Sequence, residues 1–307
     1  MEYIRGTREF QIEEPTAVTL GKFDGLHRGH KKLLEELFRF REKGCKTAVF
    51  TFETAPGTLI RKKLQTMITT NEERYENLRD AGVDYLVEYP FNEQVASMSP
   101  EEFIRELCAS CRVAEIAVGE DWHFGRGRAG DVETLRLLSG RYGFRVTAVP
   151  PILRDGERVS STRIREAVRA ADFLQAAGML GRPYRWRGPV IHGRQLGRLL
   201  DYPTANMKPG CGLQPPHGVY AVRARVNGAE YGGVANLGVR PTVEGEGGEL
   251  LLETHLFGQP GDIYGQEMEV VPVRFLRAET KFPSLEELKS QLALDAAQAA
   301  EVLRRDK

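Results

Sequence analysis

The stretch AVTLGKFDGLHRGHKKLLEEL, residues 17–37, decides how the first half of the chain folds. Residues 17–20 are apolar or β-branched, as in a buried strand, and from residue 29 onward leucines recur at helical spacing. Three glycines and two histidines, His27 and His30, lie at this transition. In a parallel α/β sheet such a turn lies at the carboxyl end of a strand, where ligands bind, and the helix N-terminus attracts anions. The stretch therefore predicts a phosphate site, although a plain tight turn would also use such glycines.

The first half of the chain alternates between strand-like and helix-like runs. The strand-like runs are residues 17–23, 47–52, 83–88, 114–119 and 145–150. Two of the helices between them begin with a capping-box pattern, at residues 70–73 and 99–102. This alternation predicts a doubly wound α/β domain with a parallel sheet, covering residues 1–181 with a linker helix at its end.

The second half, residues 182–307, has a different pattern. Short strand-like runs at residues 218–226, 230–237, 249–257 and 268–276 are separated by Gly, Pro and Asn. They predict a small antiparallel β-barrel. A final helix is expected to begin at the capping box of residues 284–287 and to continue with Leu285, Leu288, Leu292 and Leu294.

The composition indicates a globular protein and excludes some classes of function. The 307 residues include 43 Lys plus Arg and 43 Asp plus Glu, so the basic excess of general nucleic-acid-binding proteins is missing. No apolar run reaches membrane-spanning length and residues 1–10 lack a signal-peptide core, so we expect a cytoplasmic protein without a membrane partner. Cys108 and Cys111 form a lone CxxC without further zinc ligands, and we interpret them as structural thiols.

Two further stretches of the first half suit phosphates. Residues 118–131 follow a predicted strand, are rich in glycine and carry Asp121. Residues 158–166, RVSSTRIRE, place three hydroxyl side chains before a helix and an arginine one turn later. Hydroxyls and free N–H groups at a helix start bind phosphate chains, although a hydroxyl there is more often a plain N-cap. Together with the first stretch they indicate a nucleoside triphosphate site.

The second domain opens with the glycine-rich run GPVIHGRQLGRLLDYPTANM, residues 188–207. Thr204 and Asn206 offer two neutral oxygens on one face of a strand, and oxygen is the ligand atom that Mg²⁺ prefers. Further on, Glu253 lies between apolar residues in LLLETHLF. This carboxylate is either a satisfied core group or a general base, and the strand pattern alone does not separate the two.

The chain resembles the prokaryotic bifunctional riboflavin kinase/FAD synthetases along nearly its whole length. The motifs that carry the resemblance are GKFDGLHRGH, VGEDWHFGRGRAG and VSSTRIR, then PTAN, GVYA, GVANLGVRPT, ETHLF and DIYG. The resemblance implies a Rossmann-like nucleotidyltransferase domain that makes FAD from FMN and ATP with release of pyrophosphate. It also implies a riboflavin kinase barrel that makes FMN from riboflavin and ATP, with Mg²⁺ accompanying the ATP.

The resemblance further implies site residues. Catalytic roles fall to Glu253, as the base for the riboflavin 5′-hydroxyl, and to His27 and His30, as ligands of the ATP phosphates. The adenylyltransferase ATP site would comprise Gly21, Phe23, Asp24, Gly25, Gly29, Asp121, Ser160, Ser161, Thr162 and Arg165, and its flavin site Phe52, Pro56 and Phe124. The kinase ATP site would comprise Gly188, Val190, Gly193, Gly197, Arg198 and Pro203, with Arg277 and Phe282 at the flavin and Thr204 and Asn206 at the metal.

Other interpretations stay open at this point. Relatives usually carry Phe-Glu-Pro-His-Pro where this chain has FETAP, so Thr54 and Ala55 leave open an enzyme that is mainly a riboflavin kinase. The barrel could instead be a flavin-binding regulatory module, although PTAN and Glu253 argue against a pure binder. The first domain could also act on another phosphate. The sequence leaves self-association open.

Overall fold

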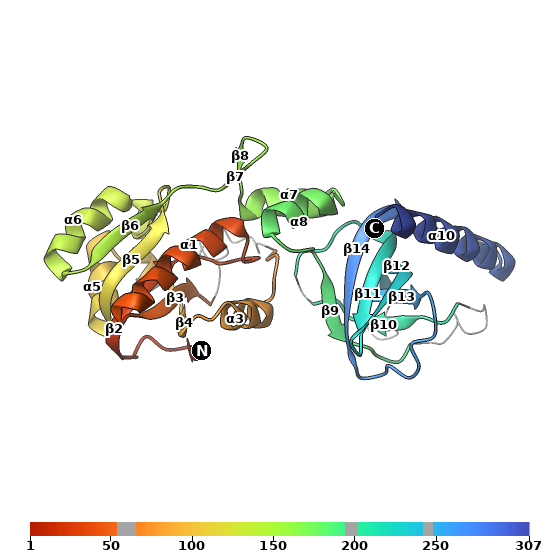
Figure 1. The fold of residues 1–307 in the computed structure, drawn as a ribbon, viewed down its shortest axis with the longest axis horizontal. Coiled ribbons are helices and arrows are strands. Elements are labelled where there is room, and N and C mark those ends of the chain that lie inside the picture. The colour runs from red at the N-terminus through yellow and green to blue at the C-terminus, as the bar shows by residue number, and fades with distance from the viewer. Residues whose placement is uncertain (54–65, 194–201, 211, 242–247, 307) are drawn as a thin grey trace. The chain divides into compact units, whose positions relative to one another are not determined.

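The computed structural model describes the chain except for residues 54–65, 194–201, 211, 242–247 and 307. Five residues named above, Thr54, Ala55, Pro56, Gly197 and Arg198, lie outside the described residues. The chain divides into two compact units, Met1–Ser161 and Thr162–Lys307 (Figure 1). The domain boundary between residues 181 and 182 stays a prediction.

A six-stranded parallel sheet forms the centre of the first unit. The strands are β1 (Glu2–Arg5), β2 (Ile12–Leu20), β3 (Lys46–Phe52), β4 (Tyr85–Tyr89), β5 (Cys111–Gly119) and β6 (Arg145–Val149). Their order is β1-β4-β3-β2-β5-β6, and every pair is parallel. The parallel sheet that the alternation predicts is therefore confirmed. The short edge strand β1 was not predicted.

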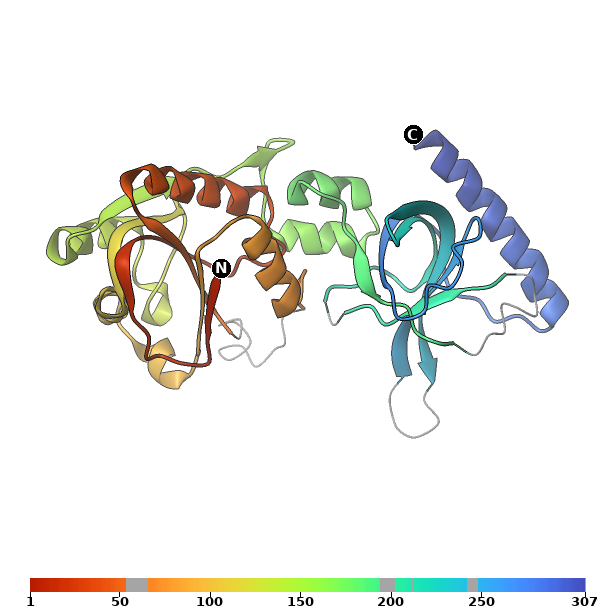
Figure 2. The same cartoon turned by 60° about the horizontal axis from the view of Figure 1, so that its bottom comes forward.

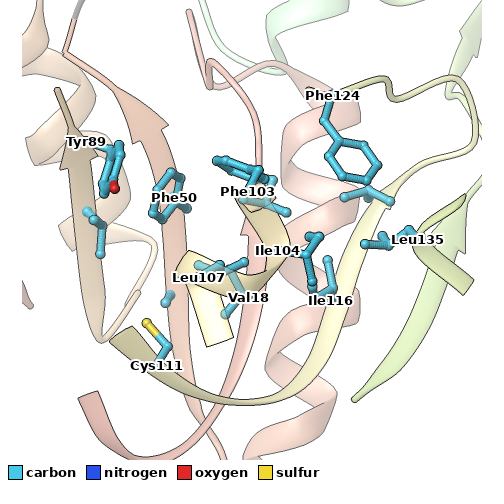
Figure 3. Close-up of a cluster of buried hydrophobic side chains, with 14 of the residues drawn as sticks. Val18, Phe50, Tyr89, Phe103, Ile104, Leu107, Cys111, Ile116, Phe124 and Leu135 are labelled. Atoms are coloured by element: carbon cyan, nitrogen blue, oxygen red, sulfur yellow. The ribbon is translucent and has the colours of Figure 1, made fainter. Parts of the chain in front are cut away.

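Helices cover both faces of this sheet. On one face lie α1 (Arg28–Phe38) and α3 (Asn71–Asp80), which bury Leu34, Leu37 and Leu78. On the other face lie α5 (Pro100–Ser110) and α6 (Val132–Tyr142), which bury Phe103, Ile104, Leu107 and Leu135 (Figure 3). The strands supply apolar residues to both faces, as in parallel sheets buried on both sides.

Local signals set where these helices begin. The predicted capping boxes form at Thr70 and Glu73 before α3, and at Ser99 and Glu102 before α5. Smaller elements of the unit are α4 (Glu93–Ser97), the 3₁₀ helices η1 (Arg39–Lys43) and η2 (Arg126–Arg128), and the hairpin of β7 (Leu153–Arg154) and β8 (Glu157–Arg158).

The strand order places a topological switch point between β2 and β5. From β2 the chain winds to β3 and β4 on one side, whereas β5 and β6 lie on the other side. Ligands of open α/β sheets bind in the crevice at the carboxyl ends of strands where the order reverses. The loop after β2 carries His27 and the loop after β5 carries Asp121, so both predicted phosphate loops leave the sheet at this point.

An antiparallel sheet forms the second unit. Its order is β10-β13-β12-β11-β14-β9. The strands are β9 (Trp186–Pro189), β10 (Ala205–Met207), β11 (Gly218–Val226), β12 (Ala229–Pro241), β13 (Gly248–Leu256) and β14 (Glu267–Arg277). A further bridge between Ile191 and Asn206 joins the segment after β9 to β10, so the sheet curls into a near-closed barrel (Figure 2). The predicted barrel is confirmed. The expected linker helix is two helices, α7 (Ser161–Arg169) and α8 (Phe173–Leu180).

The chain ends in α10 (Leu285–Arg305), which begins as expected with Ser284 accepting the backbone N–H of Glu287. The helix packs on the outer face of the barrel through Ala299, Val302 and Leu303. Leu285 and Leu294 are instead 66% and 64% exposed. The barrel contacts a different set of positions on α10, which the turn of about 100° per residue brings to one face of the helix. No helix in the described part of the chain has both the length and the apolar character needed to cross a membrane.

Candidate functional site

The turn between β2 and α1 brings His27 and His30 together. His27 is the N-cap of α1, and its Nδ1 accepts the backbone N–H of His30 at 3.3 Å. The two imidazole rings stack with centroids 3.7 Å apart and planes within 16° of parallel. A Cβ on Gly29 would lie 3.1 Å from the His27 ring, so glycine leaves the space that this ring occupies. The HxGH spacing thus builds a capped helix start with two stacked imidazoles.

Burial keeps both imidazoles neutral. Burial, and next the positive charge of Arg158, lower the pKa of His27 to about 4. Burial, the neighbouring His27 and Arg158 lower the pKa of His30 well below its ordinary value of 6.5. The Nδ1 atom of His30 is buried and has no hydrogen-bond partner among the described residues. Because an unpaired buried polar atom is costly, this nitrogen is a strong candidate for contact with a ligand.

These pKa shifts predict that the first unit loses stability in mild acid. In the unfolded chain an imidazole binds a proton near pH 6.5, whereas folded His27 binds one only near pH 4. Between these values protons favour the unfolded state. At pH 5 we expect His27 alone to lower the free energy of unfolding by about 2 kcal/mol relative to pH 7.

Urea unfolding at pH 7 and pH 5 checks this expectation. The chain has two tryptophans, Trp122 and Trp186, so Trp122 fluorescence in a Trp186→Phe background reports the first unit alone. The same background with His27→Gln and His30→Gln serves as the comparison, and its unfolding should depend less on pH. If the free energy of unfolding depends equally on pH with and without the two histidines, the lowered pKa values of His27 and His30 are not the cause of the acid destabilisation.

The segment before α3 anchors the loop that leads to His27. The backbone N–H groups of Ile68 and Thr69 donate to Oδ1 of Asp24 at 2.8 and 3.3 Å. The N–H of Gly25 donates to Oγ1 of Thr69 at 3.2 Å. Asp24 is fully buried, and these hydrogen bonds to its carboxylate fix the loop against the segment before α3. Its role as a direct ATP contact stays a prediction.

Two other predicted residues shape the same loop. Phe23 is fully buried, and its ring centroid lies 4.8 Å from that of His30. Its ring therefore packs against the stacked histidines. The N–H of Gly21 donates to the carbonyl of Phe50 on β3 at 3.1 Å, which ties the end of β2 to its neighbour. Both residues place the histidines by packing and backbone bonding.

The segment after β8 reaches the same region. Oγ of Ser161 donates to the carbonyl of Asp24 at 3.2 Å, and Arg158 forms an ion pair with Asp121. Residues from the three stretches that the sequence singled out therefore meet around the carboxyl ends of β2 and β5. Arg158 was missing from the predicted site, although its place just before the serines was a signal. Thr162 and Arg165, also predicted there, lie on α7 in the second unit.

The aromatic residues predicted at a flavin lie in or beside the core. Phe124 is 7% exposed and stacks on Trp122 with ring centroids 4.6 Å apart. It packs into the cluster between the sheet and α5 and α6 (Figure 3). Phe52 is half-buried and meets Phe91 edge-on at 4.8 Å. The structure therefore gives Phe124 a packing role, and its flavin contact stays a prediction.

Burial also decides the chemistry of the CxxC thiols. Cys108 lies near the end of α5 and Cys111 begins β5. Burial raises the pKa of Cys108 to about 11, and burial together with Cys108 raises the pKa of Cys111 to about 12. Both thiols therefore stay protonated near neutral pH, which agrees with a structural role.

In the second unit, strand register lines up a row of polar side chains. Glu253 on β13 lies directly opposite Asn206 on β10 and opposite Asn236 on β12. Opposite residues of antiparallel strands share a face, so the three side chains are neighbours. Glu253 is half-buried, whereas Leu252 and Thr254 on the other face are fully buried. The carboxylate is therefore on the outer face of the barrel wall and not in its interior.

Asn206 is the most constrained member of this row. It is 5% exposed, and its Nδ2 donates to the carbonyl of Thr204 at 3.3 Å. Its Oδ1 is buried and has no hydrogen-bond partner among the described residues. A Cβ on Gly193 would lie 2.3 Å from Nδ2 of Asn206, so only glycine lets the loop after β9 approach this amide. A buried, unpaired amide oxygen two residues from Thr204 in the chain fits Mg²⁺, which prefers oxygen ligands.

The remaining predicted kinase residues divide between wall and surface. Gly188 lies within β9, where an added Cβ would come within 3.3 Å of the Met207 side chain, and Val190 is buried, so both belong to the barrel wall. Pro203 is exposed directly before Thr204. Gly188, Val190 and Pro203 thus belong to the segments next to Asn206, and their contacts with ATP stay predictions.

Arg277, predicted at the flavin, is held by α10. Its Nε and Nη2 donate to the two carboxylate oxygens of Asp295 at 2.9 and 2.7 Å. The guanidinium also lies 5.6 Å from the ring centre of Phe282. Asp295 is buried, so this pair fastens α10 to the end of β14. Arg277 and Phe282 thus lie together, as the prediction requires, and the flavin contact itself stays a prediction.

Comparisons with known proteins cover both units. The sequence matches the FAD synthetase family over residues 9–163 and the riboflavin kinase family over residues 180–303. It is 39% identical to the bifunctional riboflavin kinase/FMN adenylyltransferase of Pseudomonas fluorescens, across 97% of each chain. The Escherichia coli K12 protein of the same name is 37% identical, across 98% of this chain and 97% of that one. A solved structure named as a macrolide-efflux protein from Streptococcus pneumoniae superposes with a TM-score of 0.80 at 31% identity, covering 95% of this chain and 96% of that chain.

The fold and these matches define an enzyme with two transferase domains, a Rossmann-like α/β domain followed by a β-barrel. The chain belongs to the family of bifunctional riboflavin kinase/FMN adenylyltransferases. Its N-terminal half is the FMN adenylyltransferase, or FAD synthetase, domain and its C-terminal half is the riboflavin kinase domain. The resemblance inferred from the motifs is confirmed, and an isolated flavin-binding barrel is not supported.

Proposed function

We propose that the C-terminal unit transfers the γ-phosphate of ATP to riboflavin, and that the N-terminal unit transfers AMP from ATP to the resulting FMN. The observation that carries this proposal is the same in both units. Each predicted phosphate site holds a buried polar atom without a partner among the described residues, Nδ1 of His30 in the first and Oδ1 of Asn206 in the second. A phosphate oxygen of ATP would accept a proton donated by Nδ1 of His30, and the Mg²⁺ that accompanies ATP would bind Oδ1 of Asn206.

In the first unit, His27 and His30 would bind the phosphates of ATP. An oxygen of the FMN phosphate attacks the α-phosphorus in line, and pyrophosphate leaves with the bonding electrons. The chain then has to position the reactants and stabilise the charge on the leaving group, for which no covalent intermediate is needed. Neutral imidazole N–H groups and the N-terminus of α1 are suited to this task.

In the second unit, Glu253 would take the proton of the riboflavin 5′-hydroxyl as its oxygen bonds to the γ-phosphorus. Thr204 and Asn206 would hold Mg²⁺, which neutralises phosphate charge when bound with ATP. The register that places Glu253 beside Asn206 supports these roles, because the base and the phosphates must meet at one point.

One incubation separates the candidate functions. The protein is mixed with riboflavin, ATP and MgCl₂, and riboflavin, FMN and FAD are separated by chromatography over time. The proposal requires FMN to appear first and FAD to follow. FMN without FAD would instead indicate a riboflavin kinase with a weak first site, and an unchanged riboflavin peak would indicate a binding module. If added FMN is not adenylylated but another phosphate compound is, the first unit has a different substrate.

Gly193→Ala should damage the kinase selectively. The new Cβ would overlap the amide of Asn206, whose position is fixed by its bond to Thr204. Since a displacement of about 1 Å in an active site can cost about 10²-fold, we expect riboflavin phosphorylation to fall by about 10²-fold. FAD formation from added FMN should be unchanged. Gly140→Ala, where nothing lies within 4 Å of the new Cβ, is the matched control. A fully active Gly193→Ala enzyme would contradict this placement of the loop.

Cellular location and partners are part of the same proposal. The balance of 43 cationic and 43 anionic residues supports small-molecule substrates and no nucleic-acid partner. We place the enzyme in the cytoplasm without a membrane partner. Light scattering after size-exclusion chromatography tests whether it self-associates.

A further inference from the structure

Beside Glu253, the barrel holds a histidine, His255, that the proposed chemistry does not use. His255 lies two residues further along β13, on the same face as Glu253, and its Nδ1 is 2.9 Å from the carbonyl oxygen of Pro203. Since a carbonyl can only accept, Nδ1 carries the proton and donates it. The ring also meets Tyr202 edge-on at 5.1 Å and Phe257 at 6.0 Å, so its orientation is fixed from two sides.

The bond from His255 completes a series of contacts along the segment that enters β10. The carbonyl of Pro203 accepts from His255, and the carbonyl of Thr204 accepts from the side chain of Asn206. The carbonyl of Asn206 accepts from the N–H of Ile191 at 2.8 Å. The backbone is thereby held on both sides of Thr204. Without the first contact, the peptide that leads into Thr204 would lose its side-chain anchor on β13.

We propose that His255 is a positioning residue for the divalent cation of the kinase: by holding the Pro203 carbonyl, it orients Thr204 and Asn206 toward the metal. This inference rests on the proposed kinase function of the barrel. Groups that orient metal ligands from outside the ligand shell commonly change metal affinity by about 10- to 100-fold. His255 would act in this way through the backbone.

A base role for His255 is the competing explanation, because Nε2 keeps its lone pair when Nδ1 donates. The register argues for Glu253 as the base, since Glu253 lies opposite Asn206 whereas His255 lies opposite Val234. Two substitutions separate the explanations. His255→Asn keeps an N–H donor near the position of Nδ1 and lacks a basic nitrogen. His255→Leu lacks both.

The first readout is the Mg²⁺ concentration that half-saturates riboflavin phosphorylation. We expect His255→Leu to raise it by about tenfold or more and His255→Asn to stay within about threefold of the original protein, with kcat at saturating Mg²⁺ largely kept in both. His217→Leu is the matched control, since His217 is exposed in the same unit. If His255→Asn instead loses kcat by about 10²-fold or more at saturating Mg²⁺, His255 is a base and the proposal is overturned.

The second readout does not need catalysis. Mn²⁺ binding in the presence of ADP is measured by the decrease of the electron paramagnetic resonance signal of free Mn²⁺. The affinity for Mn²⁺ should be lower in His255→Leu than in the original protein, and close to the original value in His255→Asn. Unchanged Mn²⁺ affinity in a folded His255→Leu protein would overturn the inference. If the original protein binds Mn²⁺ with ADP in this pattern but never phosphorylates riboflavin, the proposed function fails while the positioning role stands. Trp186 fluorescence in a Trp122→Phe background checks that each barrel variant is folded.

Discussion

Glu253→Gln is expected to lower the kcat of riboflavin phosphorylation by about 10²- to 10⁴-fold, the range typical of a positioned general base. The amide keeps the shape of the carboxylate and its place opposite Asn206, but it cannot take the proton of the attacking hydroxyl. Binding should change little, so the KM values for riboflavin and ATP should stay close to those of the original protein. Steady-state kinetics with riboflavin as the variable substrate measure both quantities.

Glu249→Gln is the matched control for this change. Glu249 lies on the same strand and its carboxylate pairs with Lys208 at 2.5 Å, in an exposed position. An exposed ion pair contributes little, so this variant should keep its kinase activity. FAD formation from added FMN should survive both substitutions, because that site belongs to the other unit. If Glu253→Gln phosphorylates riboflavin at the original rate, Glu253 is structural and the proton is taken elsewhere.

His30→Ala is expected to abolish most FAD formation while FMN formation continues. The substitution removes a half-buried imidazole that stacks on His27 and whose buried Nδ1 has no hydrogen-bond partner among the described residues. Loss of one preorganised donor to developing charge typically costs about 10²- to 10³-fold in rate, and we expect a fall of this order for adenylyl transfer. The measurement is the rate of FAD and pyrophosphate formation from FMN and ATP.

The kinase activity of the same variant is its internal control. His217→Ala, which removes an exposed histidine from the other unit, should leave both rates unchanged. A loss of both activities in folded His30→Ala would argue that the two sites are not independent. An unchanged rate of FAD formation would show that the stacked histidines do not contact the reacting phosphates.

The sequence by itself determined the elements and the family. Strands β2 to β6 and helices such as α1, α3 and α5 could be predicted because hydrophobic period and capping act within one strand or one turn, as at Thr70 and Ser99. The motifs likewise located His27, His30 and Glu253 on the chain. Local patterns of this kind do not depend on distant residues. For that reason they are visible before any fold is known.

Only the tertiary structure decided which side chains meet and which are buried. Asn206 and Glu253 become neighbours through the register of β10 on β13, which depends on the burial of the opposite face. The structure also adds a role that the sequence did not reveal for Asp24, the predicted ATP contact: its Oδ1 accepts the backbone N–H groups of Ile68 and Thr69. The burial of Phe124 was likewise not visible in the sequence, because it arises from packing in the hydrophobic cluster with residues of α5 and α6. The pKa of His30 depends on the same kind of distant packing, since desolvation arises from every segment that excludes water around a group.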